Sequence, residues 1–364
     1  MWKSIVYRLC CLLCVLPCLA HGAEVTGLYE AEVRVFSQKG DERATAMASA
    51  LAEVLAKVSG QRDAALQRGV AEATRRPAKF LQQYRYLALP DAEKYATEPG
   101  DEPQRVLFRF DKEAVDKVLR DNGLPVWGAI RPTTLVWLAV ADAERRFLVG
   151  SDMPEPLRRA LDREANRRGL ALVLPLLDLE DQSRLRFAEV WGGFREPILA
   201  ASARYHTEAV LVGRMQRTPE GEWTGTWTLL QGDAAQSWEA QGVLAEEVVD
   251  AGVAGVVDSL AARYAPAAAT RQAASLAMTV TAVHDLQDYA RVTRYLQSLQ
   301  QVVRVQPLRV EADRIGFELH LRGDAAGIVQ TIALGTVLVP VAESGAGDGQ
   351  APLQPRPVVY QLVP

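Results

Sequence analysis

The chain has 364 residues, of which 49% are hydrophobic and 24% charged, and its formal net charge is −4. No basic stripe alternates with aromatic residues, so the sequence excludes a protein that holds nucleic acid by electrostatics. The length predicts about two to three domains, at the usual size of about 150 residues each.

The chain opens with the pattern of a secretory signal peptide, at residues 1–22. Lys3 and Arg8 form a short basic start, and residues 9–20 form an apolar run that small residues follow. This run is about half the ~20 residues that span a bilayer, so we expect cleavage after residue 22 or 23. No later stretch is apolar for long enough to cross a membrane. The mature protein is therefore predicted to reside in the periplasm of a bacterium.

The signal segment holds every cysteine of the chain: Cys10, Cys11, Cys14 and Cys18. A mature chain without cysteine forms no disulfide and performs no thiol chemistry. A lipid anchor at Cys18 is the alternative, but residues 15–17 lack the small residue that lipoprotein processing requires. Of the 41 basic residues, the segment removes Lys3 and Arg8 and no acidic residue, which leaves 39 basic and 45 acidic side chains.

Residues 24–125 form the first predicted unit. Apolar residues alternate with charged ones over residues 29–35, which predicts a half-buried strand. Apolar residues at spacings of three and four predict an amphipathic helix over residues 41–60. The further elements expected are a helix at 63–75, strands at 82–89 and 106–110, and a helix at 111–120. The order β-α-α-β-β-α predicts a small α+β domain.

Residues 130–265 form the second predicted unit. Its first elements are expected to be a strand at 133–140, a helix at 154–168, a strand at 170–178, a helix at 197–205 and a strand at 208–215. Strands that alternate with helices favour parallel pairing, so we expect a layered α/β domain.

The segment GEWTGTWTLLQGDAAQSWEAQG, residues 221–242, holds three of the seven tryptophans. Trp223 and Trp227 share one face of a predicted strand and threonines share the other, while Trp238 returns on the aromatic side after a turn. This pattern predicts an antiparallel hairpin with an aromatic face and a hydroxyl face. The helix expected at 245–264 needs an apolar surface, so we predict that the tryptophans form its core contact. An uncovered aromatic platform that binds sugars or bases is the alternative.

The third predicted unit covers residues 275–342, after a linker of small residues. Its expected elements are a strand at 277–284, a helix at 286–299, strands at 302–310 and 314–321, a helix at 325–333 and a strand at 334–341. The order β-α-β-β-α-β is typical of a ferredoxin-like domain. Residues 343–364 are expected to be a flexible tail, with VVYQLV as a candidate edge strand. The predicted fold class is thus mixed α+β and α/β, in three small modules.

The mature chain carries no recognisable catalytic motif. Its three histidines fall in different elements and lack metal-ligand spacing: His206, His284 and His320. His206 and Glu208 form the one local acid–base pattern, and we interpret His206 as an exposed or capping residue. Since nucleophile elbows, phosphate loops and zincin helices are absent from the sequence, we predict no catalytic residue, metal or cofactor. Glu189 and Glu196 are the best pair for a hydrolase that works through two carboxylates.

Two segments are candidate interfaces. Trp191 and Phe194 flank two glycines and precede Arg195, in a predicted loop whose rings either face a partner or fill their own core. The segment LPVWGAIRP holds Trp127 and Arg131 and joins the first two units. This segment is a second candidate surface, or else a contact between the units.

Several segments together resemble an uncharacterised family of proteobacterial envelope proteins, catalogued as domain of unknown function 2066. These segments are LPVWGAIRPTTLVWLAV, EAVLVGRM with EWTGTWTL, LAEVLAKVSG and DYARVTRYLQSL. The family has no established activity to transfer. More loosely, AVLVGRM with the following tryptophans is similar to domains of periplasmic accessory proteins, such as those of the Tol system and of outer-membrane assembly factors. That resemblance implies action through protein contact.

The sequence therefore favours a non-catalytic periplasmic interaction or accessory protein of the cell envelope. This hypothesis expects an envelope protein as partner and leaves the partner's identity and the oligomeric state open. The alternative is a cell-wall glycan-binding module or a carboxylate-dependent hydrolase, acting through exposed tryptophans and acidic residues.

Overall fold

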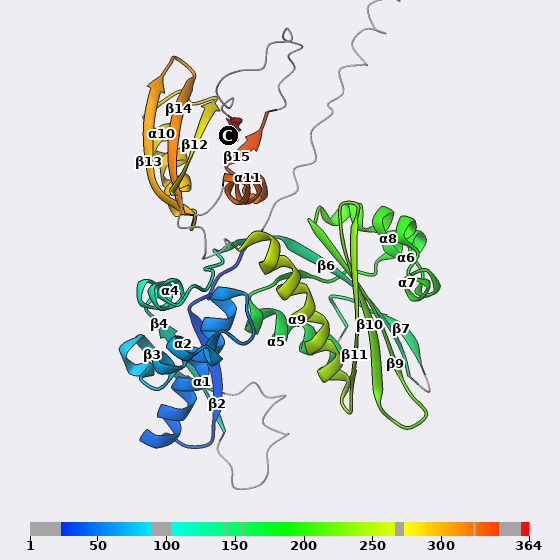
Figure 1. The fold of residues 1–364 in the computed structure, drawn as a ribbon. Coiled ribbons are helices and arrows are strands. Elements are labelled where there is room, and N and C mark those ends of the chain that lie inside the picture. Colours follow the sequence, from blue (N-terminus) through cyan, green and yellow to red (C-terminus); the bar gives the residue numbers. More distant parts are fainter. Residues whose placement is uncertain are drawn as a thin grey trace, which may run out of the picture.

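The computed structural model describes residues 23–88, 103–142, 145–153, 156–265, 273–322, 325–341 and 358–363. Within these ranges the chain is a mixed α/β protein with ten α-helices and four β-sheets (Figure 1). The predicted signal segment, and with it every cysteine, lies outside the described residues. None of the helices in the described ranges is both long enough and apolar enough to cross a bilayer.

The N-terminal part has the predicted order of helices and strands. Its elements are β2 (Glu30–Val35), α1 (Gly40–Ser59), α2 (Arg68–Thr74), β3 (Leu81–Leu87), β4 (Gln104–Phe110) and α4 (Lys112–Asp121). The strands form an antiparallel sheet in the order β2-β4-β3, and α1 packs its apolar face against this sheet. The helix expected at 63–75 is instead a 3₁₀ turn (Ala64–Leu66) followed by α2, because Gln67 between them is extended.

Gly60 ends α1 and brings the helix close to the next part of the chain. Its φ of 72° is a left-handed conformation, which glycine adopts without strain. A Cβ at this position would lie 2.3 Å from the Cβ of Ala261 and 3.2 Å from Cε3 of Trp127. Glycine is therefore required here both by the backbone and by close packing.

The central part is built on a six-stranded sheet. Its elements are β6 (Thr133–Ala141), β7 (Arg146–Val149), α5 (Pro156–Arg168), β8 (Ala171–Val173), α6 (Leu179–Arg184), α7 (Phe187–Gly192), α8 (Arg195–Ser202), β9 (Ala209–Arg217), β10 (Trp223–Gln231), β11 (Ala234–Gly242) and α9 (Ala245–Tyr264). The order is β11-β10-β9-β6-β7, and β8 also pairs with β6. As predicted, β6 runs parallel to β8 and β9.

Helices cover the two faces of this sheet unequally. On one face α5 and α9 bury the larger apolar cluster, and on the other α6, α7 and α8 bury a smaller cluster mainly over β6 and β9 (Figure 1). The second face of β10 and β11 therefore extends beyond the helical layer. This uncovered area is where the candidate site lies.

Two predictions about the central part were wrong. The strand expected at 170–178 is reduced to β8, because Pro175 follows it and Leu177 has a φ of 52°. The predicted loop around Trp191 is a tight connection between two helices. Gly192 ends α7, Gly193 has a φ of 67°, and α8 begins at Arg195.

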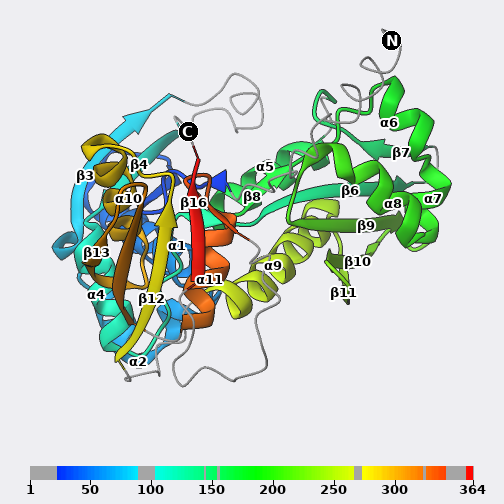
Figure 2. The ribbon, with the colours of Figure 1, turned by 90° about the horizontal axis from the view of Figure 1, so that it is seen from above.

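The C-terminal part has a five-stranded sheet. Its elements are β12 (Ala273–Thr281), α10 (Leu286–Ser298), β13 (Val302–Val310), β14 (Arg314–Arg322), α11 (Ala325–Leu334), β15 (Leu338–Pro340) and β16 (Val358–Leu362). The strand order is β13-β14-β12-β16-β15. The candidate edge strand in the tail is therefore an interior strand, parallel to β12 (Figure 2). Its other neighbour is β15, to which it is antiparallel. Tyr360 and Leu362 are buried, which explains why β16 lies inside the sheet.

A short two-stranded sheet joins the N-terminal and central parts. In it, β1 (Ala23–Glu24) pairs antiparallel with β5 (Ile130–Arg131). The start of the described chain therefore lies beside the junction of the two parts.

Candidate functional site

Trp127 and Arg131 lie inside the junction between the N-terminal and central parts. Their exposed fractions are 2% and 0%. All the N–H groups of Arg131 point to backbone carbonyls, and the donor–acceptor distances are 3.0 Å to Gly128, 3.3 Å to Arg168, 2.8 Å to Gly169, 2.9 Å to Lys57 and 3.1 Å to Trp127.

Two of the carbonyls that Arg131 contacts belong to helix C-termini. Lys57 is in the last turn of α1 and Arg168 ends α5, so the guanidinium lies at the negative ends of both helix dipoles. Its Cζ also lies 4.0 Å from the centroid of the Trp127 ring, a cation–π contact. Burial lowers the pKa of Arg131. The segment at 124–132 is thus a contact inside the chain, and it offers these two side chains to no outside partner.

The tryptophans of the hairpin face α9, as the core prediction required. Trp227 is fully buried, and Trp223 and Trp238 are half-buried against the same cluster. A Cβ at Gly252 would lie 2.3 Å from Cε2 of Trp227, so the helix rests directly on the ring. The alternative of an exposed platform on this face was wrong.

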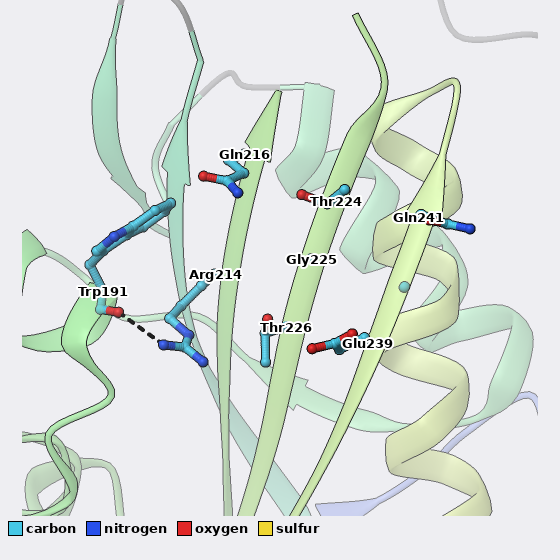
Figure 3. Close-up of a pocket in the computed structure, with 9 residues that line it drawn as sticks. Trp191, Arg214, Gln216, Thr224, Gly225, Thr226, Glu239 and Gln241 are labelled. Carbon is cyan, nitrogen blue, oxygen red and sulfur yellow. Dashed lines mark hydrogen bonds between the residues drawn. The ribbon is translucent and has the colours of Figure 1, made fainter. Parts of the chain in front are cut away.

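The opposite face of the hairpin, together with β9 and α7, forms an open polar groove. Its volume is about 770 Å³, within the range of about 300–1,000 Å³ typical of ligand sites. Nine residues line the groove (Figure 3): Trp191, Arg214, Gln216, Thr224, Gly225, Thr226, Glu239, Ala240 and Gln241. Hydroxyl, amide and charged groups dominate this lining.

Strand register arranges the polar side chains in two rows. Arg214, Thr226 and Glu239 are directly opposite one another on β9, β10 and β11. The next row holds Gln216, Thr224 and Gln241. Successive side chains of a strand alternate between its faces, so both rows belong to the face of the sheet that carries the groove (Figure 3). Each row offers hydrogen-bond donors and acceptors to one extended ligand.

Trp191 forms the wall of the groove on the side of α7 (Figure 3). Its ring stacks on Phe187, with centroids 5.4 Å apart and planes 19° apart. Its carbonyl accepts a hydrogen bond of 3.3 Å from Nη1 of Arg214. The side chain is half-buried, so part of the ring remains available to a ligand.

The two charges of the groove are not neutralised inside the described part of the chain. Within those residues, no carboxylate lies at ion-pair distance from Arg214, and no cation lies at ion-pair distance from Glu239. Charged groups without an opposite charge at ion-pair distance are available to an incoming charged group.

Phe194 and Arg195 follow Trp191 in the chain but do not line the groove. Phe194 is 57% exposed, and its ring lies over Gly192, where a Cβ would be 2.9 Å from Cζ. Arg195 donates from Nη2 to the carbonyl of Gly232 in the turn between β10 and β11. Of the three predicted interface residues of this segment, the structure therefore places Trp191 in the groove, and Phe194 and Arg195 outside its lining.

Sequence reasoning identified Trp191 and the hydroxyl face but missed Arg214 and Glu239. The alternating pattern assigned Thr224 and Thr226 to one face. The contribution of β9 was not predicted, because its register against β10 depends on a connection that the sequence pattern does not specify.

The candidate acid–base residues have local structural contacts. Glu189 accepts a hydrogen bond of 2.7 Å from the backbone N–H of Arg186, at the start of α7. Glu208 accepts one of 2.6 Å from the N–H of Thr133, where β6 begins. His206 has a φ of 50° and caps a 3₁₀ turn (Ala203–Tyr205). In the ranges that the structure describes, no three His, Cys, Asp or Glu residues are grouped to hold a metal.

Comparison with known families gives one match. The family model described as Domain of unknown function (DUF8605) matches residues 22–128. This finding corrects the resemblance to domain of unknown function 2066, which is a different family. A comparison with curated proteins found no match. The matched region holds α1 and the sheet of β2, β3 and β4, and it ends before the six-stranded sheet that carries the groove.

Proposed function

We propose that this chain is a non-catalytic interaction protein of the bacterial cell envelope, exported to the periplasm, and that it binds a protein partner in the polar groove. The observation that carries the proposal is the groove itself, in which Trp191, Arg214 and Glu239 surround two rows of donors and acceptors. Tryptophan and arginine are enriched among the residues that dominate binding energy at protein interfaces. Phe194, three residues after Trp191, is 57% exposed and outside the groove lining.

The proposal includes a chain built from three modules, and the separation of the buried clusters supports this. One cluster lies within residues 28–126, two lie within 127–261 and one lies within 278–362. Modules with separate cores leave loops and sheet edges available for contact. The last module keeps the predicted β-α-β-β-α-β order, with β16 added inside the sheet.

Crosslinking in intact cells, followed by mass spectrometry of what co-purifies, tests this function. Arg214→Ala and Glu239→Ala should each reduce recovery of the partner about tenfold, the usual loss at an interface residue worth about 1.4 kcal/mol. Neither side chain supports the buried clusters, so both variants should keep the circular dichroism of the wild type. Arg76→Ala is the matched control, because Arg76 is an exposed arginine of the N-terminal part, outside the groove. Equal recovery by all variants would contradict the proposal.

A glycan ligand is the second candidate, because Trp191 adjoins hydroxyl and amide side chains. Aromatic rings beside such groups suit sugars, and Trp227 is too deeply buried to serve. Peptidoglycan fragments should then change the fluorescence of the wild type and leave that of Trp191→Phe unchanged. The absence of any change at millimolar fragment would rule out this candidate.

A further inference from the structure

β11 is the last strand of the six-stranded sheet, and one of its sides has no partner among the described residues. All nine of its residues pair with β10 without a register shift. On the other side, its backbone makes no hydrogen bond to any residue that the structure describes. Alternate N–H and C=O groups of such an edge form a template for another strand.

β11 also lacks most of the features that usually protect an edge, and Glu239 is its one charged residue. The edge strand β13 contains Pro307 and two register shifts, and β15 has three residues including Pro340. β11 contains no proline, lysine, arginine or bulge. Natural proteins use those devices to prevent strand pairing, so their absence from the longest regular edge indicates an edge that is paired.

We propose that a second copy of this chain pairs with β11 in an antiparallel arrangement, across a two-fold axis at Trp238. A two-fold axis perpendicular to the sheet places the same face of both copies on the same side. Since directly opposite residues of antiparallel strands point to the same face, the axis must lie where one residue faces its own copy. Trp238 is the middle of Ala234–Gly242, so this centre pairs the whole strand with its copy. Any other centre leaves residues unpaired.

The side chains that would face each other support the same centre. With the axis at Trp238, Glu239 faces Ser237 of the partner subunit, and a carboxylate opposite a hydroxyl accepts its hydrogen bond. Gln241 then faces Ala235 of the partner subunit. An axis moved one residue along would set the two Glu239 carboxylates directly opposite each other, which is unfavourable.

The helix above the edge leaves room for a second copy. Gly255 of α9 lies over Trp238, where a Cβ would be 2.4 Å from Cε2. Ser259, one turn along, bonds Gln236 on β11 at 2.9 Å, so this side of α9 faces the edge. Ala251 completes the row at a spacing of four. These small side chains let two α9 helices pass at the usual packing distance of about 8–10 Å.

Sedimentation velocity of the chain from residue 23, which retains all described structure, tests this pairing. Over about 1 to 100 µM the wild type should form a dimer in a concentration-dependent way. Ser237→Glu places like charges opposite Glu239 twice and should raise the dissociation constant about tenfold or more. Ser237→Lys places opposite charges there and should leave the dissociation constant unchanged or lower it. Thr228→Glu adds the same charge to β10 on the same face, and it should leave the dimer intact.

Amide exchange of β11 gives a second measurement that does not depend on any variant. Its outward N–H groups should become protected as the protein concentration rises. A wild type that stays monomeric with freely exchanging β11 amides would overturn the proposal, and so would equal effects of Ser237→Glu and Ser237→Lys. The test is independent of the groove's partner, because Arg214→Ala should leave the dimer unchanged.

Discussion

Arg131 shows how a buried charge is held without a carboxylate, by backbone carbonyls and by the ring of Trp127. Its carbonyl partners come from α1, from the segment before β5 and from the end of α5. A guanidinium has five N–H donors in a fixed plane. Here five backbone carbonyls accept from them, so no carboxylate is needed. The cost of burial is offset by hydrogen bonds and by the helix dipoles, and the residue joins three segments at one point.

Replacing Arg131 should destabilise the protein strongly. Arg131→Lys offers three N–H donors to the five carbonyls, so some of these buried acceptors lose their hydrogen bond. Arg131→Met offers no donor, so all five lose it. We expect each variant to lose about 3–5 kcal/mol of unfolding free energy, measured by urea denaturation. The exposed control Arg76→Lys should stay within about 0.5 kcal/mol. Losses below about 1 kcal/mol in both Arg131 variants would contradict this account of the junction.

The ionised carboxylate of Asp178 should stabilise the folded protein, and this stabilisation should be lost at acidic pH. Arg204 hydrogen-bonds both its oxygens, at 2.8 and 3.0 Å, and the N–H of Asp181 adds a bond of 2.9 Å. The hydrogen bonds from Arg204, and then that from Asp181, lower the pKa of Asp178 from 3.8 to about 2. A lowered pKa means that the unfolded chain takes up the proton first as the pH falls. The stabilisation is therefore complete above about pH 4 and is lost between about pH 4 and 2.

Thermal unfolding across that pH window tests the Asp178 contact. The melting temperature of Asp178→Asn should fall less steeply than that of the wild type as the pH drops from about 4 to 2.5. Arg204→Gln removes the largest cause of the shift and should flatten the profile in the same way. Parallel profiles for all three proteins would show that the contact does not titrate in this range.

At the scale of elements, α9 and the hairpin were predicted well because each follows one simple period. The helix begins and ends at the expected residues, and the aromatic face lies where alternation placed it. β8 and β16 were predicted poorly. Their lengths and positions depend on Pro175 and on pairing with β12 across the sheet, and neither is a periodic signal.

Gly252→Ala tests how closely α9 rests on the sheet. Alanine favours a helix by about 1 kcal/mol over glycine, but its Cβ would lie 2.3 Å from the Trp227 ring. Overpacking of this kind costs about 1–3 kcal/mol, so the melting temperature should fall, and the near-ultraviolet circular dichroism of the tryptophans should change. Gly40→Ala, at the open start of α1, is the matched control and should be neutral or stabilising. A stabilised Gly252→Ala variant would contradict the close contact.

At the scale of the whole molecule, Asp116 links the first and last parts of the chain. It is buried, and it accepts hydrogen bonds from Tyr29 at 2.8 Å, Lys112 at 2.6 Å and Gln300 at 2.7 Å. Burial, and then the negative charge of Asp116, raise the pKa of Tyr29. Gln300 follows α10, so its amide connects the C-terminal sheet to α4. No local pattern predicts this contact, because Asp116 and Gln300 are 184 residues apart in the chain.

Removing the Gln300 amide should loosen the C-terminal part selectively. Gln300→Ala loses a bond to a charged acceptor, worth about 1.5–3 kcal/mol, so amides of β12 and β14 should exchange about tenfold faster or more. Amides of β6 and β9 should keep their rates. Gln297→Ala, on the exposed side of α10, is the matched control. Uniform acceleration in both sheets would show that the chain opens as one unit.

The polar groove is proposed to hold a protein partner. Photocrosslinking in intact cells from a reactive residue at Gln216, which lines the groove and is exposed, tests it most directly. The same reactive residue at Gln67, an exposed glutamine of the N-terminal part, is the control. We expect one reproducible protein adduct from position 216 that is absent from position 67 and is lost on Arg214→Ala. The same adducts from both positions, or none from position 216, would contradict it.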